Sequence, residues 1–533
     1  MDAKRIKGTS RFATTVLLLF TISVCLQAQQ PSAPQIRMRW EDFISGPDGA
    51  KRLASLKAGV AKMKSLDSSS PTSADYRRSW QYWANIHGYY GTVSPDGTVA
   101  QQIQYLQSIG MGNYVPYYTG ITDQTPPDSD AQTIWATCQH SFSGTQANFF
   151  GWHRMYLYYF ERVLRWAAGD DTLRLPYWDY TDPAQVALPA EFQDTASTLY
   201  DAKRDPGLNT GASTLNSNST DIDTLLPEPS YLTYELNIEE GIHGYVHCTV
   251  GPRCPVAHMG DVPVAGNDPV FYSHHANIDR LWACWQNLHP DPGGSWENQQ
   301  FSFVDETGTL QTEPVKNFLD STSLGYIYDN VASCGRGTAP APPTNLHATP
   351  DPPGNSPDPP PQKMTMLAAV KRIPINRPRI AVNISLPQPA MHRLLAQPEG
   401  AGRIELVLRD ITAASHPGVL FDVYLEKKEE PKAHQFVGTI SWFGAFRHHG
   451  HPVAERRTLQ YEVTGQLRKL GITAETSDVT VSLEATLGRV PANPSKAEEM
   501  RSLAAKAFRP EAKLQIGAIE LRQAAMTPVP EKR

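Results

Sequence analysis

The longest helical pattern of the chain lies between residues 149 and 168. Its sequence, FFGWHRMYLYYFERVLRWAA, repeats large apolar side chains at helical spacing and holds few charges, which predicts a long buried helix. Residues 237–247 and 268–286 are also predicted to be helical. Residues 205–230 are polar and rich in turn-forming residues, which predicts a long surface loop.

The pattern changes in the last third of the chain, where apolar and polar residues alternate over short segments. Alternation combined with β-branched residues predicts strands. These segments are 419–426, 436–443, 459–467, 478–487 and 513–521, and one helix-like stretch at 495–508 interrupts them. Several short strands at this spacing predict a β-sandwich or a barrel.

A proline-rich segment separates the two patterns. Residues 339–362 contain ten prolines and no apolar periodicity, so this segment is predicted to be an exposed, semi-rigid linker. The predicted organisation is a helical domain at 29–338, the linker, and a β domain at 363–533. The fold class is therefore a multidomain α + β protein.

Residues 1–28 have the features of a secretory signal peptide. Four basic residues precede an apolar run from Thr14 to Leu26, and Ala28 is a plausible cleavage point. The run is short for a membrane span, although an uncleaved anchor is the alternative. The prediction is a secreted or periplasmic protein whose mature form lacks a membrane segment.

The charge of the chain is distributed unevenly. The formal net charge of −6 argues against broad nucleic-acid binding, which needs a basic surface. Residues 371–533 hold 24 basic and 17 acidic residues, a net charge of +7, whereas residues 29–370 carry −16. Opposite charges on two tethered units predict that the β domain docks on the helical domain, unless the surface charges coincide by chance.

Six histidines occur in settings that suit metal ligation. His243 and His247 are four residues apart and lie on one face of the predicted helix, so both can bind one metal ion. A pair at this spacing can also be an ordinary surface feature. Three neutral imidazoles per metal ion suit copper, iron or zinc. The complete set is His87, His140, His153, His243, His247 and His275.

The motifs around these histidines resemble those of the tyrosinase and catechol oxidase (polyphenol oxidase) family of type-3 copper proteins. The motifs are IHGYYG, FFGWHRMYLYYFE, LRLPYWDY, IEEGIHGYVH and NDPVFYSHHANIDRLWACW, and they cover most of 75–330. The resemblance implies a four-helix bundle around two copper ions. It further implies oxidation of o-diphenols to o-quinones with O2, and in some members hydroxylation of monophenols.

The resemblance also assigns the ligands. It places the first copper ion on His87, His140 and His153, and the second on His243, His247 and His275. His274, beside His275, would lie outside the ligand set.

One spacing departs from the family pattern, because twelve residues lie between His140 and His153 where the family usually has eight. The Cys138-Gln139-His140 sequence resembles a cysteine–histidine pair that some members join by a thioether bond. A buried free thiol at Cys138 is the alternative.

Further residues acquire roles through the resemblance. Glu239 would position a water molecule near the copper site, and the alternative is a solvated helix carboxylate. Members that hydroxylate monophenols strongly often carry Asn at the position of Gly244. Because Gly has no side-chain amide, Gly244 favours diphenol oxidation. Val262 lies near the position where some members carry a bulky Phe over the copper site, which implies an open entrance to that site. Asp279 would orient ligand imidazoles by hydrogen bonding.

Six cysteines are too few for a disulfide-built scaffold. Cys25 lies within the signal. The other candidates for disulfide bonds allow three pairings, between which the sequence does not choose: Cys248, Cys254, Cys284 and Cys334.

The β domain resembles the C-terminal domain of plant-like polyphenol oxidases through GVLFDVYLEKK and HQFVGTISWF. In that family this domain covers the copper site and keeps the enzyme latent. The resemblance therefore implies a latent oxidase that acts on phenolic small molecules and that an activating protease could cut at the linker.

Two other classes of function stay open. One is a haemocyanin-like protein that binds O2 reversibly at the same copper pair without turnover. The other is a copper-binding protein that has lost catalysis.

Overall fold

The structure is a computed structural model that describes residues 33–70, 72–87, 103–104, 107, 130, 134, 147–252, 254, 258–289, 293–331, 334, 364–386, 403–427, 430–445, 457–472 and 478–524. All elements below lie within the unit Pro34–Arg533. The predicted signal at 1–28 and the linker at 339–362 lie outside the described residues. Among the described residues, no helix combines the length and apolar character needed to cross a membrane.

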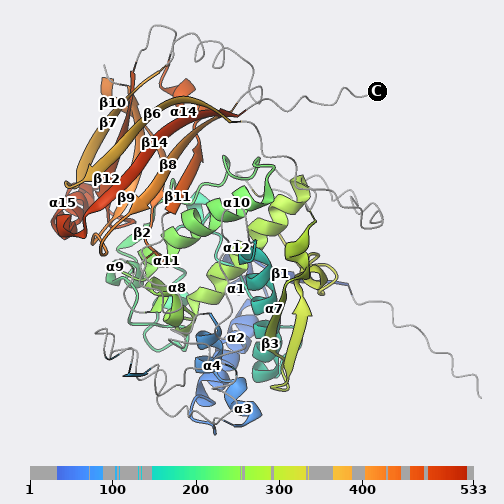
Figure 1. Cartoon of the computed structure of the whole chain (residues 1–533). Helices are drawn as coiled ribbons and strands as arrows, with labels where there is room; N and C mark the ends of the chain where they lie inside the picture. The colour runs from blue at the N-terminus through green and yellow to red at the C-terminus, as the bar shows by residue number, and fades with distance from the viewer. Residues whose placement is uncertain are drawn as a thin grey trace, which may run out of the picture. The chain divides into compact units, whose positions relative to one another are not determined.

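Helices dominate the described chain up to residue 331 (Figure 1). The α-helices are α1 (Trp40–Ile44), α2 (Gly49–Ser65), α3 (Ala74–Arg77), α4 (Trp80–Ile86), α7 (Phe149–Ala168), α8 (Ala190–Gln193), α9 (Pro206–Asn209), α10 (Tyr231–Asn237), α11 (Gly244–Val250) and α12 (Val270–Leu288). A π-helical segment, η4 (Ile238–His243), joins α10 to α11.

Helix α7 has the bounds that the sequence predicts, and fourteen of its twenty residues are buried. It ends at Gly169, whose φ of +63° is a left-handed conformation that glycine adopts without strain. Aromatic side chains hold α7 against α12, where the rings of Phe160 and Tyr272 stack with centroids 3.6 Å apart. Packing of buried aromatic rings therefore fixes α7 against α12.

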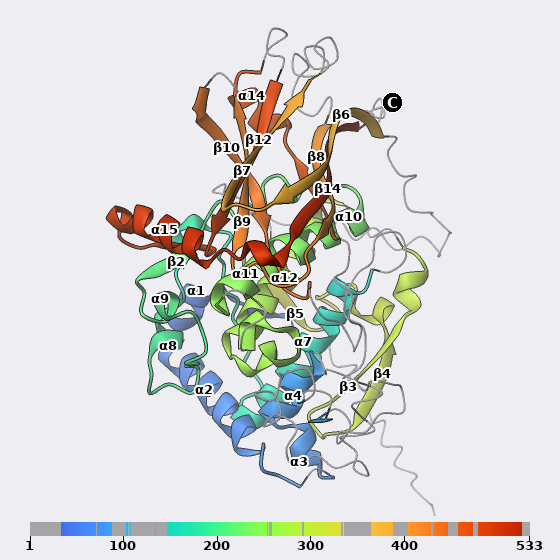
Figure 2. The ribbon, with the colours of Figure 1, turned by 60° about the vertical axis from the view of Figure 1, so that its left-hand side comes forward.

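After residue 363 the described chain is mainly β-structure. Its strands are β6 (Met364–Ile375), β7 (Arg379–Ser385), β8 (Arg403–Thr412), β9 (Leu420–Lys427), β10 (Glu430–Ile440), β11 (Arg457–Glu462), β12 (Asp478–Thr486), β13 (Arg489–Pro491) and β14 (Leu514–Ala524). Two four-stranded antiparallel sheets, ordered β10-β9-β12-β7 and β11-β8-β14-β6, form the two layers seen in Figure 2. The expected α + β class with a sandwich-like C-terminal part is confirmed.

The predicted strand at 459–467 is wrong in its second half. Strand β11 ends at Glu462, and α14 (Thr464–Lys469) follows. Thr464 and Leu467 are buried three residues apart, which is helical spacing, so the apolar pattern of this segment changes period within nine residues. The predicted helix at 495–508 corresponds to α15 (Ala497–Ala507).

We call the described residues 34–334 the helical part and the described residues 364–524 the β part. A short two-stranded ladder joins them. The predicted loop 205–230 contains β2 (Ser213–Leu215), which pairs antiparallel with β13, so that Val490 lies opposite Thr214. The remaining small sheets belong to the helical part: β1 (Gln35–Arg37) pairs with β5 (Tyr326–Tyr328), and β3 (Gln300–Val304) pairs with β4 (Leu310–Pro314). The boundaries predicted for the separate domains stay predictions.

Candidate metal centre

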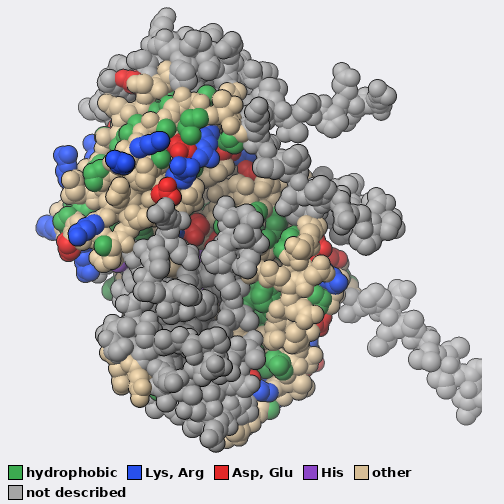
Figure 3. All heavy atoms as spheres, viewed as in Figure 1, with side chains coloured by type: hydrophobic (Ala, Val, Ile, Leu, Met, Phe, Trp, Pro, Cys, Tyr) green, Lys and Arg blue, Asp and Glu red, His purple; other side chains and the backbone are tan. Residues whose placement is uncertain are grey.

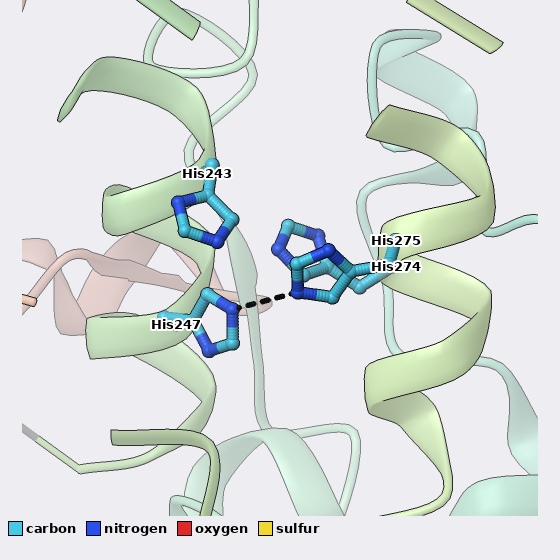
Figure 4. Close-up of side chains that lie close together, drawn as sticks. All are labelled: His243, His247, His274 and His275. Atoms are coloured by element: carbon cyan, nitrogen blue, oxygen red, sulfur yellow. Dashed lines mark hydrogen bonds between the residues drawn. The ribbon is translucent and has the colours of Figure 1, made fainter. Parts of the chain in front are cut away.

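Four helical segments converge on a cluster of buried histidines. The segments are the C-terminal end of α4, the first half of α7, the η4–α11 segment and the first half of α12. Figure 4 shows the side chains of the η4–α11 segment and of α12 facing one another. Every described member is at most 2% exposed: His87, His153, His243, His247, His274 and His275.

The cluster forms two groups that could each hold a metal ion. One consists of His243, His247, His274 and His275, and the other of His87, His153 and His275, with the candidate ligand atoms of each group within 4.8 Å of one another. His275 belongs to both groups. Its Nε2 lies 3.2 Å from Nε2 of His247, and its ring stacks on that of His153 with centroids 4.5 Å apart.

Backbone carbonyls orient four of these imidazoles. The contacts run from His87 Nδ1 to the Val262 carbonyl (2.8 Å), from His153 to Phe149 (2.7 Å), from His243 to Glu239 (3.0 Å) and from His247 to Met259 (2.7 Å). Because a carbonyl oxygen only accepts, each Nδ1 must carry the hydrogen. In the neutral ring, Nε2 then keeps its lone pair, as a metal ligand requires.

The charge state of the cluster also suits metal binding. Burial, followed by repulsion between neighbouring imidazoles, lowers the pKa of His243, His247 and His275 well below its ordinary value. Burial lowers the pKa of His274 to about 3. These imidazoles are neutral at physiological pH.

Three of their ring nitrogens are buried without a hydrogen-bond partner: Nε2 of His243, Nε2 of His274 and Nδ1 of His275. Buried polar atoms are nearly always satisfied, so these nitrogens indicate a missing ligand. Imidazole-only donor sets of this kind fit copper, iron or zinc. The residues present therefore fit the two metal ions implied by the sequence.

Two predicted residues, His140 and Cys138, lie outside the described residues. His274 lies closer to the cluster than expected, because it is a member of one group while its Nδ1 is hydrogen-bonded to the Tyr180 hydroxyl at 2.8 Å.

Glu239 and Gly244 flank His243 in the η4–α11 segment, and both are buried. Glu239 contributes its backbone carbonyl to the orientation of His243. Val262 is 7% exposed, and its backbone carbonyl orients His87. Its place at an open entrance stays a prediction.

Asp279 has a different environment from the one the sequence suggests. Its carboxylate accepts hydrogen bonds from Arg154 Nε (2.5 Å), Arg37 Nη1 (3.1 Å), Tyr326 (2.7 Å) and Tyr328 (2.6 Å). Burial opposes its ionisation, but the two arginines lower its pKa below the ordinary value. These contacts join α12 to α7, β1 and β5, and none of them reaches an imidazole.

The β part contributes a side chain to the cluster that the sequence did not single out. The ring of Phe443, which follows β10, stacks on that of His247 with centroids 3.8 Å apart and meets that of His243 edge-on at 5.3 Å. Phe443 is 6% exposed. Its signal in the sequence, an aromatic residue at the end of a predicted strand, is too common to identify it.

Polar contacts surround Phe443. Ser441 donates from Oγ to the Glu240 carbonyl (3.3 Å), and its own carbonyl accepts from Arg457 Nη1 (2.5 Å). Arg457 also forms an ion pair with Glu240. Glu240, which precedes His243 by three residues, is thus bound by the β part.

Further polar contacts cross the same boundary. Figure 3 shows Lys and Arg side chains on the described face of the β part, and two arginines of this part bind acidic residues of the helical part. These contacts are Arg403 to Glu228 (2.6 Å), Arg489 to Asp205, the Tyr245 hydroxyl to the Gly488 carbonyl (2.6 Å), and Ser219 to Thr439 (2.8 Å).

The four candidate cysteines form two disulfide bonds in the structure. One joins Cys248 to Cys254, next to His247, and the other joins Cys284 in α12 to Cys334.

Known proteins share this sequence pattern and fold. The common central domain of tyrosinase matches residues 77–223 and 207–288. Aureusidin synthase of Antirrhinum majus is 29% identical over 237 residues, which are 36% of this chain and 42% of that protein. Polyphenol oxidase C, chloroplastic, of Solanum lycopersicum is 25% identical over 503 residues, which are 84% of this chain and 70% of that protein.

The match to aureusidin synthase thus spans less than half of that protein's length. Latent apple tyrosinase has a similar fold, with a TM-score of 0.55 and 20% identity over 93% of this chain and 98% of that chain. The matched central domain contains every described histidine of the cluster. Residues 77–288 of the chain thus carry the common central domain of tyrosinase.

Proposed function

We propose that the chain is a latent, copper-dependent polyphenol oxidase that oxidises o-diphenols to o-quinones with O2. The observation that carries the proposal is the buried cluster of neutral imidazoles, four of which have their Nδ1 bound to backbone carbonyls. In the proposed assignment the first copper ion binds to His87, His140 and His153, and the second to His243, His247 and His275. The match of residues 77–288 to the common central domain of tyrosinase supports a copper pair at this place.

When bound, a copper pair would carry two electrons from a diphenol to O2. Loss of two electrons and two protons converts an o-diphenol to an o-quinone. The side chains around it would control access and protons. Glu239 would hold a water molecule that receives the phenolic proton. Gly244 offers no side-chain amide beside His243, which favours diphenols over monophenols as substrates.

The proposed latency rests on Phe443. Its ring lies on His247 and beside His243, where a phenolic ring would have to approach the second group of histidines. The β part would therefore exclude substrate until it moves or is removed by proteolysis within 339–362. The similar fold of latent apple tyrosinase supports this arrangement.

Two further proposals concern residues outside the described part of the chain. We propose that 1–28 is an export signal, although the tomato relative is named chloroplastic, and N-terminal sequencing of the mature protein tests this. We also propose a thioether bond between Cys138 and His140, which would appear in peptide mass spectra as the loss of two hydrogens.

The function is tested with purified protein loaded with copper. Copper content and oxidation of 4-methylcatechol and tyramine are measured before and after limited proteolysis. We expect about two copper ions per chain, slow oxidation before cleavage, and fast oxidation of the catechol afterwards. A cleaved, copper-loaded protein that binds O2 but forms no quinone would instead support the oxygen-carrier alternative.

His243→Gln is the informative variant, and His289→Gln is its control. His289 lies outside the cluster and is hydrogen-bonded to the Leu226 carbonyl. We expect the first substitution to remove about half of the copper and nearly all turnover, and the second to change neither.

A further inference from the structure

Gly244 lies in the helical part, next to the histidines, and faces Ser441 and Phe443 of the β part. It is the first residue of α11, follows His243 and is buried. A Cβ atom placed on Gly244 would lie 2.5 Å from Ser441 Oγ and 3.6 Å from Phe443 Cβ. Real Cβ atoms essentially never lie as close as 2.5 Å to a non-bonded heavy atom.

The backbone of Gly244 does not require glycine. Its φ of −61° and ψ of −34° are ordinary helical values that any L-residue adopts. Glycine is also the least favourable residue in a helix after proline. The physical reason for glycine at this position is therefore the space taken by Ser441 and Phe443.

Ser441 cannot move away without losing contacts. It is fully buried, its hydroxyl donates to the Glu240 carbonyl, and its own carbonyl accepts from Arg457. A methyl group at position 244 would force the hydroxyl to rotate and break its hydrogen bond. A longer side chain would also collide with Phe443.

We propose that residue 244 determines whether the β part can pack over the histidines through Ser441 and Phe443. We call this packed β part the cover. A side chain at position 244 then weakens the packing of the cover in proportion to its size. The position would then couple two properties. An asparagine, which would supply an amide beside His243, would at the same time push Ser441 and Phe443 away. In this protein, latency and a side-chain amide at 244 exclude each other.

The test is amide hydrogen exchange in the full-length chain, followed by mass spectrometry. Peptides covering 436–445 and 457–462 report on the seated cover without needing copper or turnover. We expect amide exchange in these two peptides to accelerate about threefold in Gly244→Ala and about tenfold or more in Gly244→Asn. Exchange in α12 should stay unchanged, which shows that the helical part remains folded.

Gly241 provides the matched control. It lies one turn earlier in η4, and a Cβ atom there would meet nothing within 4 Å. Gly241→Ala and Gly241→Asn should therefore leave exchange in both peptides at the wild-type rate. Equal effects at the two positions would show that the helix itself is perturbed and would overturn the proposal.

A double variant tests the contact directly. Ser441→Ala removes the hydroxyl that a Cβ atom at 244 would strike, so Gly244→Ala combined with Ser441→Ala should exchange more slowly than Gly244→Ala alone. The proposal is wrong if the double variant exchanges at the sum of the two single effects, or if Gly244→Asn keeps wild-type protection.

The inference rests on the proposed function only for its consequence in catalysis. If the proposed oxidase is right, Gly244→Asn should also oxidise 4-methylcatechol faster than wild type without proteolysis. Absence of quinone with accelerated exchange would reject the oxidase and keep the docking role. Quinone formation with unchanged exchange would keep the oxidase and reject the docking role of residue 244.

Discussion

At the scale of single residues, Phe443 is predicted to be the side chain that blocks the histidine cluster. Phe443→Ala removes a buried ring whose burial contributes about 2 kcal/mol to seating the cover. The rate of 4-methylcatechol oxidation by the uncleaved chain should therefore rise by roughly ten- to hundredfold. Phe436→Ala is the control, since Phe436 lies in β10, the strand that precedes Phe443, and its ring packs on Tyr424. Equal activation by both substitutions would contradict the assignment.

Asp422 is a residue whose ionisation should affect stability. Its buried carboxylate accepts a hydrogen bond from Thr439 (2.7 Å) and lies opposite Glu484 on the neighbouring strand. Burial is the main cause that raises the pKa of Asp422 to about 7, whereas an unfolded aspartate titrates near about 4. The stability gained by the protonated form is complete below about pH 4 and is lost as the pH rises to about 7.

Asp422→Asn should therefore reduce the loss of thermal stability between about pH 4 and 7, by up to about 4 kcal/mol over the whole window. Thermal unfolding of the full chain at a series of pH values measures this difference. Asp478→Asn, at an exposed aspartate–serine pair of the same sheet, should keep the wild-type pH dependence. An unchanged slope in Asp422→Asn would mean that this carboxylate is ionised in the folded protein.

At the scale of elements, Arg457 connects β11 to the segment that holds Phe443 and to η4. Burial lowers the pKa of Arg457 to about 10, so the guanidinium stays charged at neutral pH while it binds Glu240 and the Ser441 carbonyl. Losing a charge-assisted hydrogen bond of this kind costs about 2 kcal/mol. Arg457→Gln should raise oxidation by the uncleaved chain by about tenfold or more.

Arg409→Gln is the control for Arg457→Gln. Arg409 is 45% exposed and pairs with Glu520 inside the β part at 3.4 Å, away from the boundary. Its replacement should leave the basal rate unchanged. Activation of the two variants to the same extent would show that general destabilisation of the sheets, and not the Arg457 contact, opens the site.

The elements also show how far sequence reasoning extends. The bounds of α7 and β12 follow from local periodicity, which is repeated over many residues. The orientation of the histidine pair on the η4–α11 segment follows from the i, i+4 spacing. By contrast, the contacts of Asp279 and Phe443 join segments far apart in the chain, and no local pattern encodes such pairings. Local patterns thus predict which side chains are available, and tertiary packing decides what each of them contacts.

At the scale of the whole molecule, charge separates the chain into a strongly acidic and a basic part. Residues 29–370 carry a net charge of −16 and residues 371–533 carry +7. Cross-boundary ion pairs such as Arg403–Glu228 show where part of this attraction acts. Salt shortens the range of attraction from about 30 Å at 0.01 M to about 3 Å at 1 M, so it should weaken seating of the cover.

The expected result is a rise of a few-fold in oxidation by the uncleaved chain between about 0.02 M and 0.5 M salt. Protein cleaved within 339–362 and purified away from its β part should show no such rise, which corrects for direct effects of the anion on the site. The double substitution Arg403→Gln and Arg489→Gln should flatten the salt response of the uncleaved chain, because both side chains bind acidic residues across the boundary. If the uncleaved and cleaved proteins respond to salt identically, the attraction between the two parts does not hold the cover, and the packing around Gly244 and Phe443 must do so alone.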